Sequence, residues 1–250
     1  MYQFFVESTQ VQGDEIVITG SDVNHIGNVL RMKAGEKLRV SDSAGRSYFC
    51  RISEIAPDMV RAGIEREDEL GTELSNRIVL FQGLPKADKM ELIIQKAVEL
   101  GASEIIPVAM KNCVVKLDDK KAAAKVSRWK NIAESAAKQS KRTLIPTVQM
   151  PVSWKEALNL AKELDITLVP YENERGMQAT REIIGDIGAK ESIGIMIGPE
   201  GGFSDAEIAM VDEAHADCGS FHRISLGRRI LRTETAGLAT LAMLVYQLDI

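Results

Sequence analysis

The sequence has few of the residues that build disulfide frameworks or metal centres. Among 250 residues there are three cysteines and three histidines. The cysteines lie far apart, which suggests reduced and buried thiols. The histidines lack the spacing of metal ligands, so we expect no metal.

Long apolar runs are also missing. No stretch approaches the length of a membrane span, and the first residues lack the basic flank of a secretory signal. We therefore expect a cytoplasmic protein without a membrane partner. With 45% hydrophobic residues, the chain can bury one large core or two modest ones.

A strong positive charge is missing as well, since the formal net charge is -5. Bulk charge therefore does not favour a protein that coats nucleic acid. Locally the balance reverses, because residues 120–142 hold eight basic side chains, the single acid Glu134 and Trp129. Such a run is compatible with phosphate contacts, although a solvated helix face is the more frequent explanation.

The first 71 residues predict a small antiparallel barrel. Short apolar stretches at 4–6, 15–19, 37–40, 47–55 and 59–64 are separated by glycines and by Pro57-Asp58. One helix interrupts them, with Ser21 as its expected N-cap. The acidic stretch 65–71 predicts a linker.

From residue 72 onward the periodicity changes to an alternation of strands and helices. We expect strands at 78–81, 105–108, 166–169, 193–197 and 221–225. Helices are expected at 87–100, 119–140, 153–164, 177–184, 204–214 and 234–248. This order predicts an α/β fold with a parallel sheet covered on both faces. Ligands of such sheets bind beyond the carboxyl ends of the strands.

The most informative segment is Ile193-Gly-Ile-Met-Ile-Gly-Pro-Glu-Gly-Gly-Phe-Ser-Asp-Ala-Glu-Ile208. A buried strand breaks into a glycine-rich turn that leaves room for a ligand close to the backbone. Ser204 and Glu207 have the spacing of a capping box, which predicts a helix start. The turn has neither the G-x-G-x-x-G order nor the Gly-Lys-Ser/Thr of nucleotide loops.

A second segment, Ile224-Ser-Leu-Gly-Arg-Arg-Ile-Leu-Arg-Thr-Glu-Thr-Ala236, has the same layout of strand end, turn and helix start. Together the two segments closely resemble the signature of the SPOUT methyltransferases, and specifically the family that methylates N3 of a uridine in small-subunit ribosomal RNA. Further similarity lies at 4–6, 25–33, 89–101, 128–129 and 136–140. The resemblance spans essentially the whole chain.

The resemblance implies a two-domain architecture. Residues 1–71 would form a PUA-like RNA-binding β-barrel, and residues 72–250 a SPOUT domain with a trefoil knot. It also implies a homodimer with the site at the subunit interface. The last expected helix is apolar almost all round, which agrees with cover from a second subunit, although cover from its own chain is equally compatible.

The resemblance further implies S-adenosyl-L-methionine as cofactor and 16S ribosomal RNA as substrate. Two residues are candidates for catalysis: Arg232, as a cation that stabilises negative charge on the base, and Glu200, which could orient the loop or contact a ligand. Glu234 is more readily explained as structural, at a helix start. Cofactor contacts are expected from Tyr171, Gly198, Pro199, Glu200, Gly201, Gly202, Leu226, Gly227, Ile230 and Leu231.

Basic side chains from both expected domains are candidates for phosphate contacts. They are Arg31, Lys33, Lys96, Arg128, Lys138, Arg142 and Arg228. Two other functions stay open: a SPOUT enzyme with another target, such as a transfer RNA ribose, and a non-catalytic RNA-binding assembly protein. Two intact loops disfavour the latter.

Overall fold

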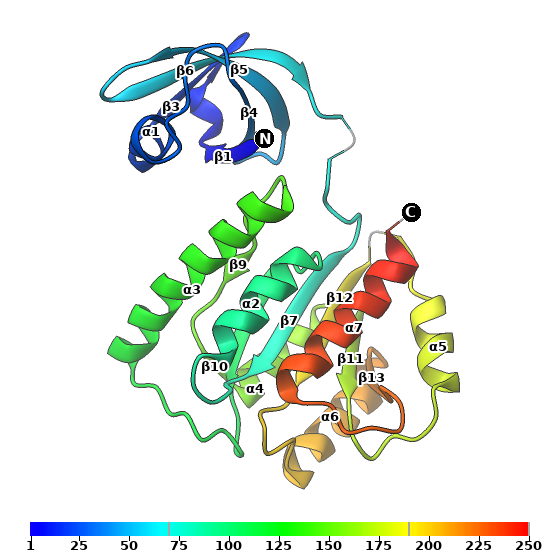
Figure 1. Cartoon of the computed structure of the whole chain (residues 1–250). Coiled ribbons are helices and arrows are strands. Elements are labelled where there is room, and N and C mark those ends of the chain that lie inside the picture. The colour runs from blue at the N-terminus through cyan, green and yellow to red at the C-terminus, as the bar shows by residue number, and fades with distance from the viewer. Residues whose placement is uncertain (70, 190, 250) are drawn as a thin grey trace. The chain divides into compact units, whose positions relative to one another are not determined.

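A computed structural model describes residues 1–69, 71–189 and 191–249 (Figure 1). The chain divides into two compact units. The first combines Met1–Glu73 with Ala137–Ile145, and the second combines Leu74–Ala136 with Pro146–Ile250. The sequence did not indicate that residues 137–145 belong with the N-terminal unit.

The first unit is built on a curled six-stranded sheet (Figure 1). Its strands are β1 (Tyr2–Val6), β2 (Val11–Gln12), β3 (Glu15–Thr19), β4 (Lys37–Asp42), β5 (Ser47–Ile55) and β6 (Met59–Glu67). They run in the order β1-β4-β5-β6-β3-β2, and β1 pairs with β4 in parallel. The expected sheet was wholly antiparallel, so this pairing corrects it.

The predicted helix of this unit is distorted. It comprises α1 (Ser21–Asn24) and one π-helical turn (His25–Val29), and its N-cap is Gly20 rather than Ser21. A short 3-10 turn (Ser8–Gln10) precedes β2. Val23 and Ile26 enter the apolar core of the unit beside residues such as Phe4, Leu38 and Ile52.

The acidic stretch 65–71 is not wholly a linker, because Glu65, Arg66 and Glu67 complete β6. Glu65 pairs with Lys37 of β4 and Arg51 of β5, at 3.1 and 2.6 Å. Residue 70 of this stretch lies outside the described residues.

The second unit contains an entirely parallel sheet. Its strands are β7 (Arg77–Gly83), β8 (Glu104–Ala109), β9 (Thr147–Val148), β10 (Val152–Ser153), β11 (Ile166–Pro170), β12 (Ser192–Ile197) and β13 (Phe221–Ile224). The order is β10-β8-β7-β12-β11-β13, with β9 beside β8. The central strands are almost completely buried, which agrees with their apolar runs.

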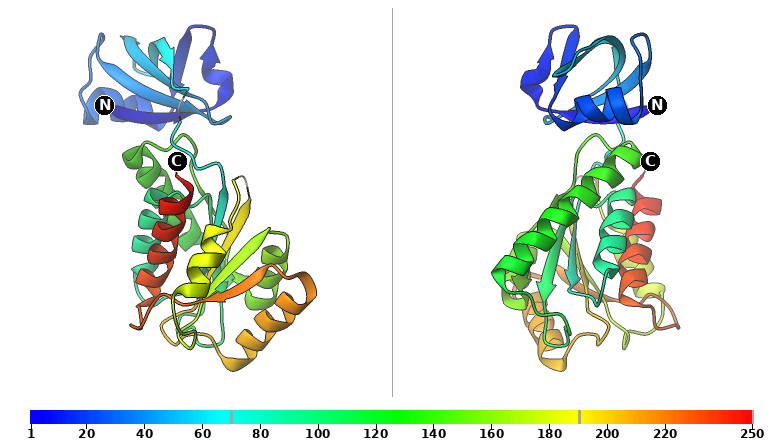
Figure 2. Two further views of the ribbon diagram at one scale, coloured as in Figure 1. Left: turned by 90° about the vertical axis from the view of Figure 1, so that its right-hand side faces the viewer. Right: turned by 60° about the vertical axis from the view of Figure 1, so that its left-hand side comes forward.

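Helices cover this sheet (Figure 2). They are α2 (Lys89–Glu99), α3 (Asp119–Ser140), α4 (Trp154–Lys162), α5 (Gln178–Gly185), α6 (Asp205–Cys218) and α7 (Thr233–Leu248). Each corresponds to a predicted helix. α7 packs against α2, α5 and β12, while α4 packs against α6.

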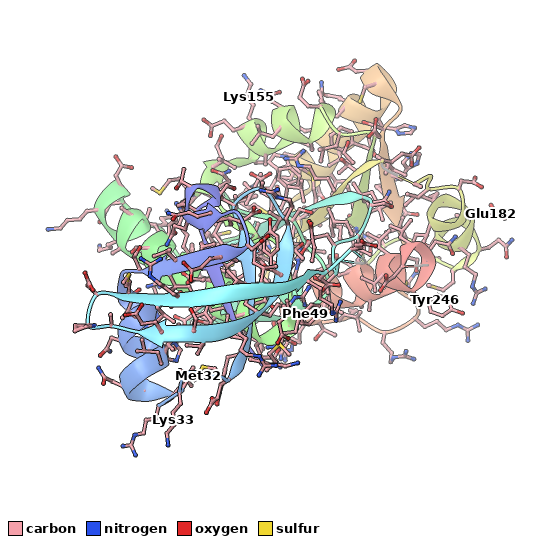
Figure 3. The ribbon with its side chains drawn as sticks, turned by 90° about the horizontal axis from the view of Figure 1, so that it is seen from above. Met32, Lys33, Phe49, Lys155, Glu182 and Tyr246 are labelled. Atoms are coloured by element: carbon pink, nitrogen blue, oxygen red, sulfur yellow. The ribbon has the colours of Figure 1, made fainter. Side chains whose placement is uncertain are left out.

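Helix α7 is covered by its own chain along one stripe only. Gly237, Thr240, Leu241 and Leu244 are buried, at the i, i+3, i+4 and i+7 spacing of one helix face. The opposite face leaves Tyr246 90% exposed, and its side chain projects from the helix in Figure 3. The helix therefore has one face that its own chain leaves open.

Candidate functional site

The two signature segments form two loops at one edge of the parallel sheet. The first loop, residues 198–204, joins β12 to α6, and the second loop, residues 225–232, joins β13 to α7. Strand β11 lies between β12 and β13, so the two strand ends are not direct neighbours. The chain leaving β11 at Tyr171 and Glu172 therefore contributes a third segment to the site.

Two adjoining cavities lie among these three segments, with volumes of about 460 and 260 Å³. Their combined size falls within the roughly 300–1,000 Å³ that is typical of small-molecule sites. The larger cavity is lined by the first loop and the start of α7, the smaller by the second loop. Both share Pro170, Glu172, Ile230, Leu231 and Ala236.

All ten residues expected to contact a cofactor line these cavities. The larger cavity includes residues 198–202, the smaller includes Tyr171, Leu226 and Gly227, and both include Ile230 and Leu231. Arg232 lines the larger cavity and Arg228 the smaller one. The structure thus brings together residues from three distant parts of the sequence.

The first loop is held rigidly. The predicted capping box is present: Ser204 accepts a hydrogen bond from the Glu207 amide, and Glu207 accepts one from the Ser204 amide at 2.8 Å. Gly202 has a φ of +67°, which favours glycine. Asn112, which the sequence gave no reason to select, donates to the carbonyls of Gly201 and Gly202 at 3.1 and 3.2 Å.

A buried chain of hydrogen bonds connects this loop to α7. The Gln82 amide donates to the Thr233 hydroxyl at 2.9 Å, and that hydroxyl donates to the Gly198 carbonyl at 2.6 Å. Gln82 is fully buried at the end of β7. A polar residue directly after the apolar run 78–81 was the signal that could have identified it.

An ion-pair cluster fixes Glu200. Its carboxylate accepts from the Lys86 amide at 3.0 Å and lies 3.1 Å from the Lys89 ammonium. Lys89 also lies 3.1 Å from Glu234, so one lysine joins the first loop to the start of α7. Burial alone would raise the pKa of Glu200, but these hydrogen bonds and the Lys89 charge outweigh it and lower that pKa. The same two carboxylates raise the pKa of Lys89.

The second loop is open to solvent. Arg228, Arg229 and Arg232 are exposed, and Ile230 is 86% exposed. Within the described chain, none of the three arginines forms an ion pair with a carboxylate. Gly227 has a φ of +100°, which favours glycine, and its amide donates to the Ser225 hydroxyl.

Six of the seven residues expected to bind phosphate fall into two groups. Arg31, Lys33 and Arg228 are exposed, and Lys33 points away from the ribbon in Figure 3. Arg128, Lys96 and Lys138 are exposed or half-buried but paired with Glu91, Glu99 and Asp22, respectively.

The expectation that Arg142 contacts phosphate is not met. Its side chain is 6% exposed and forms a bidentate pair with Glu73, which also accepts from the amides of Thr143 and Leu144. Since its guanidinium is occupied inside the chain, Arg142 is not a phosphate ligand. Trp129 is likewise a core residue, 3% exposed.

Among the described residues, none of the helices combines the length and the hydropathy that a membrane span requires. No group of three or more histidine, cysteine, aspartate or glutamate side chains among them is placed to hold a metal ion.

Comparison with known families agrees with this architecture. The profile of a family described as RNA methyltransferase domain matches residues 72–245. The profile of a second, described as RNA methyltransferase PUA domain, matches residues 18–65. The fold class expected from the sequence is confirmed: a SPOUT methyltransferase domain with a parallel sheet and an N-terminal PUA-like domain.

Individual relatives are similar over nearly their whole length. "Ribosomal RNA small subunit methyltransferase E" of Bacillus subtilis (strain 168) is 37% identical, covering 100% of this chain and 98% of the relative. The protein of the same name from Mesomycoplasma hyopneumoniae (strain 232) is 34% identical, covering 95% and 96%. A crystal structure of a ribosomal RNA small subunit methyltransferase E from Neisseria gonorrhoeae bound to S-adenosyl methionine has a TM-score of 0.82 at 31% identity, covering 98% and 97%.

Proposed function

Because the chain belongs to the RNA methyltransferase family, we propose that it transfers a methyl group from S-adenosylmethionine to N3 of a uridine in 16S ribosomal RNA. The observation that carries the proposal is the pair of adjoining cavities, lined by both signature loops. The small-subunit RNA is proposed from the names of the relatives, and the cofactor from the Neisseria structure. Position N3 of a uridine is proposed from the resemblance of the two loops.

The residues of the site fit this cofactor. Apolar side chains such as Ile197, Phe203 and Leu231 offer a surface for adenine, while the glycine-rich first loop exposes its backbone to polar ligand groups. When bound, S-adenosylmethionine supplies an electrophilic methyl group. The rigid first loop would hold the cofactor in a fixed position, which lowers the entropic cost of bringing two reactants into line.

Arg232 is the proposed electrostatic catalyst. Arg232 lines the larger cavity, and its side chain has no carboxylate partner in the described chain. A uracil that loses its N3 proton carries negative charge on O2 and O4, and a positioned cation stabilises that charge. Glu200 is better suited to hold the loop, since its carboxylate is already engaged by Lys86 and Lys89.

The proposed RNA contacts come from exposed cations of each unit. In the first unit these are Arg31 and Lys33, and in the second they are Arg228 and two further lysines of α3, Lys120 and Lys130. Such side chains can neutralise phosphates without disrupting the fold. The target base must be unstacked to enter a cavity.

The proposed assembly is a homodimer that uses the open face of α7. Leu238, Ala242, Val245 and Tyr246 lie away from the buried stripe of this helix. Tyr246→Glu should convert a dimer into a folded monomer, as measured by light scattering. Leu241→Glu cannot test the interface, because Leu241 is completely buried within its own chain. A monomeric wild-type protein would contradict the assembly.

The deciding experiment is mass spectrometry of nucleosides from 16S ribosomal RNA of cells that lack the protein. The proposal expects the loss of one N3-methylated uridine, restored by the wild-type gene. Loss of a different methylated nucleoside would identify another RNA target. An unchanged set of nucleosides would contradict a methyltransferase role in this RNA.

A further inference from the structure

Two carboxylates line the cavities, and they differ in how they are held. Glu200 belongs to the larger cavity and Glu172 to both. Glu200 accepts from the Lys86 amide and pairs with Lys89, and its side chain is only 16% exposed. The pKa of Glu200 is lowered, so it is a weak proton acceptor.

Glu172 is exposed and lies over the glycine turn. A Cβ atom added to Gly202 would come within 3.0 Å of its Oε1, which places the carboxylate directly against the first loop. In the described part of the chain, its oxygens accept no hydrogen bond and form no ion pair. Glu172 is therefore the carboxylate at this site that is free to receive a proton and to move.

Freedom to move matters for chemistry at N3 of uracil. The proton on N3 lies in the plane of the ring, at the position where the methyl group must arrive. The acceptor must therefore approach, take the proton and withdraw before transfer. A side chain on an open loop segment can do this, whereas Glu200 is fixed by two partners.

The pairing edge of uracil also fits the polar groups of the cavities. That edge presents an acceptor, the N3–H donor and a second acceptor, and folded RNA can expose it in an unstacked base. Glu172 supplies an acceptor, and Arg232 supplies donors in the same cavity. Cytosine has no proton on N3, so a carboxylate at this position would also disfavour it.

Resting on the methylation proposed above, we propose that Glu172 is the proton acceptor of the reaction. The N3–H bond breaks and its proton passes to a Glu172 oxygen, leaving the electron pair on N3. That pair forms the N3–CH₃ bond while the methyl–sulfur bond breaks, and its electrons return to sulfur. The sulfonium becomes a neutral thioether, and Glu172 then releases its proton to water.

The pH profile of the rate is one test, and several groups around the cavities influence it. They are Tyr171 and Arg175 beside Glu172, Glu200 from the first loop, and Arg228, Arg229 and Arg232 from the second loop. Variants that leave these six groups unchanged isolate the contribution of Glu172.

The experiment compares Glu172→Gln, Glu172→Asp and the matched control Glu174→Gln. Glu174 lies two residues away and pairs with Arg223 at 3.0 Å, outside both cavities. Single-turnover methylation of undermethylated small-subunit particles is measured against pH at saturating S-adenosylmethionine. Calorimetry measures the affinity for S-adenosylhomocysteine, and thermal unfolding verifies the fold.

We expect Glu172→Gln to lower the single-turnover rate about 100-fold, with unchanged affinity for S-adenosylhomocysteine. Its rate should rise steadily at alkaline pH, as the uracil ionises without help. Glu172→Asp should recover part of the rate, and Glu174→Gln should match the wild type.

A Glu172→Gln rate equal to that of the wild type would overturn the inference. If the same variant also lost affinity for S-adenosylhomocysteine, Glu172 would be a cofactor ligand instead. Failure of the wild-type protein to methylate the particles would instead contradict the proposed function.

Discussion

The two loops of the site differ in whether their charged side chains have partners within the chain. Around the first loop, Glu200 is paired with Lys89 and Glu207 accepts from the Lys111 amide. In the second loop, Arg228, Arg229 and Arg232 are exposed and have no carboxylate partner in the described chain. We therefore propose that the paired charges hold the first loop in place and that the unpaired charges of the second loop are available to a ligand.

Helix α3 and the segment after it show the same contrast. Lys120 and Lys130 are exposed and form no ion pair in the described chain. Further along, Lys138 pairs with Asp22 and Arg142 with Glu73, and these residues belong to the first unit. A run of basic residues thus contains both structural charges and candidates for RNA contacts.

The largest expected effect is a loss of stability when the cation of a buried ion pair is removed. Arg142→Ala should destabilise the first unit by roughly 3 kcal/mol, because Glu73 would be left partly buried without its cation. Chemical denaturation measures the loss. Lys37→Ala removes an exposed pair with Glu65 in the same unit and should cost less than about 1 kcal/mol. Equal costs would remove the distinction between the two kinds of pair.

The same pair predicts a dependence on pH. Burial would raise the pKa of Glu73, but Arg142 and the amides of Leu144 and Thr143 outweigh it and lower that pKa. The stabilisation is therefore fully present above the ordinary glutamate pKa and is lost as the pH falls through the lowered folded-state value. Acid unfolding of Arg142→Ala should begin at higher pH than that of the wild type.

An unpaired charge should affect the reaction rather than the fold. Arg232→Ala should lower the single-turnover rate about 100-fold, since one preorganised charge contact is lost in the transition state. Its unfolding midpoint and its affinity for S-adenosylhomocysteine should stay unchanged. Arg181→Ala, which removes an exposed arginine of α5 outside both cavities, is the control. If Arg232→Ala keeps the full rate, a cation other than Arg232 stabilises the negative charge of the transition state.

Lys89, unlike Arg232, is a paired charge, and its removal tests the role of the ion pairs at the first loop. Lys89→Met leaves Glu200 and Glu234 without their shared cation, which should loosen the first loop relative to α7. We expect about tenfold weaker binding of S-adenosylhomocysteine in calorimetry, equivalent to about 1.4 kcal/mol. Lys96→Met is the matched control, because Lys96 lies on the same helix and its one ion pair among the described residues is with Glu99. Equal affinities would show that the ion pairs of Lys89 with Glu200 and Glu234 are not needed for binding.

Local patterns in the sequence predicted most of the elements. The apolar run at 193–197, the capping box of Ser204 and Glu207 and the helix at 234–248 all depend on neighbouring residues, and each is confirmed. The ten expected cofactor contacts came from the family resemblance. Their meeting at two cavities follows from the parallel sheet, whose strands end at one edge.

Contacts between distant residues were not predictable in the same way. Lys89 forms ion pairs with Glu200 and Glu234, each more than a hundred residues away in sequence. Gln82 forms a hydrogen bond with Thr233, which is 151 residues away. Sequence periodicity identifies which face of a helix is buried but not the partner of a charge. For that reason Arg142 resembled a phosphate ligand until its partner Glu73 was located.

The smallest expected effect comes from the unpaired lysines of α3. Lys120→Ala with Lys130→Ala should leave stability unchanged and reduce the salt dependence of RNA binding by about two in the log–log slope, one for each phosphate contact. Binding to small-subunit particles at several salt concentrations measures it. Lys155→Ala with Lys162→Ala removes two cations from α4 and controls for net charge. If both double variants flatten the slope equally, the effect reflects total charge, and the unpaired lysines of α3 are not a dedicated contact surface.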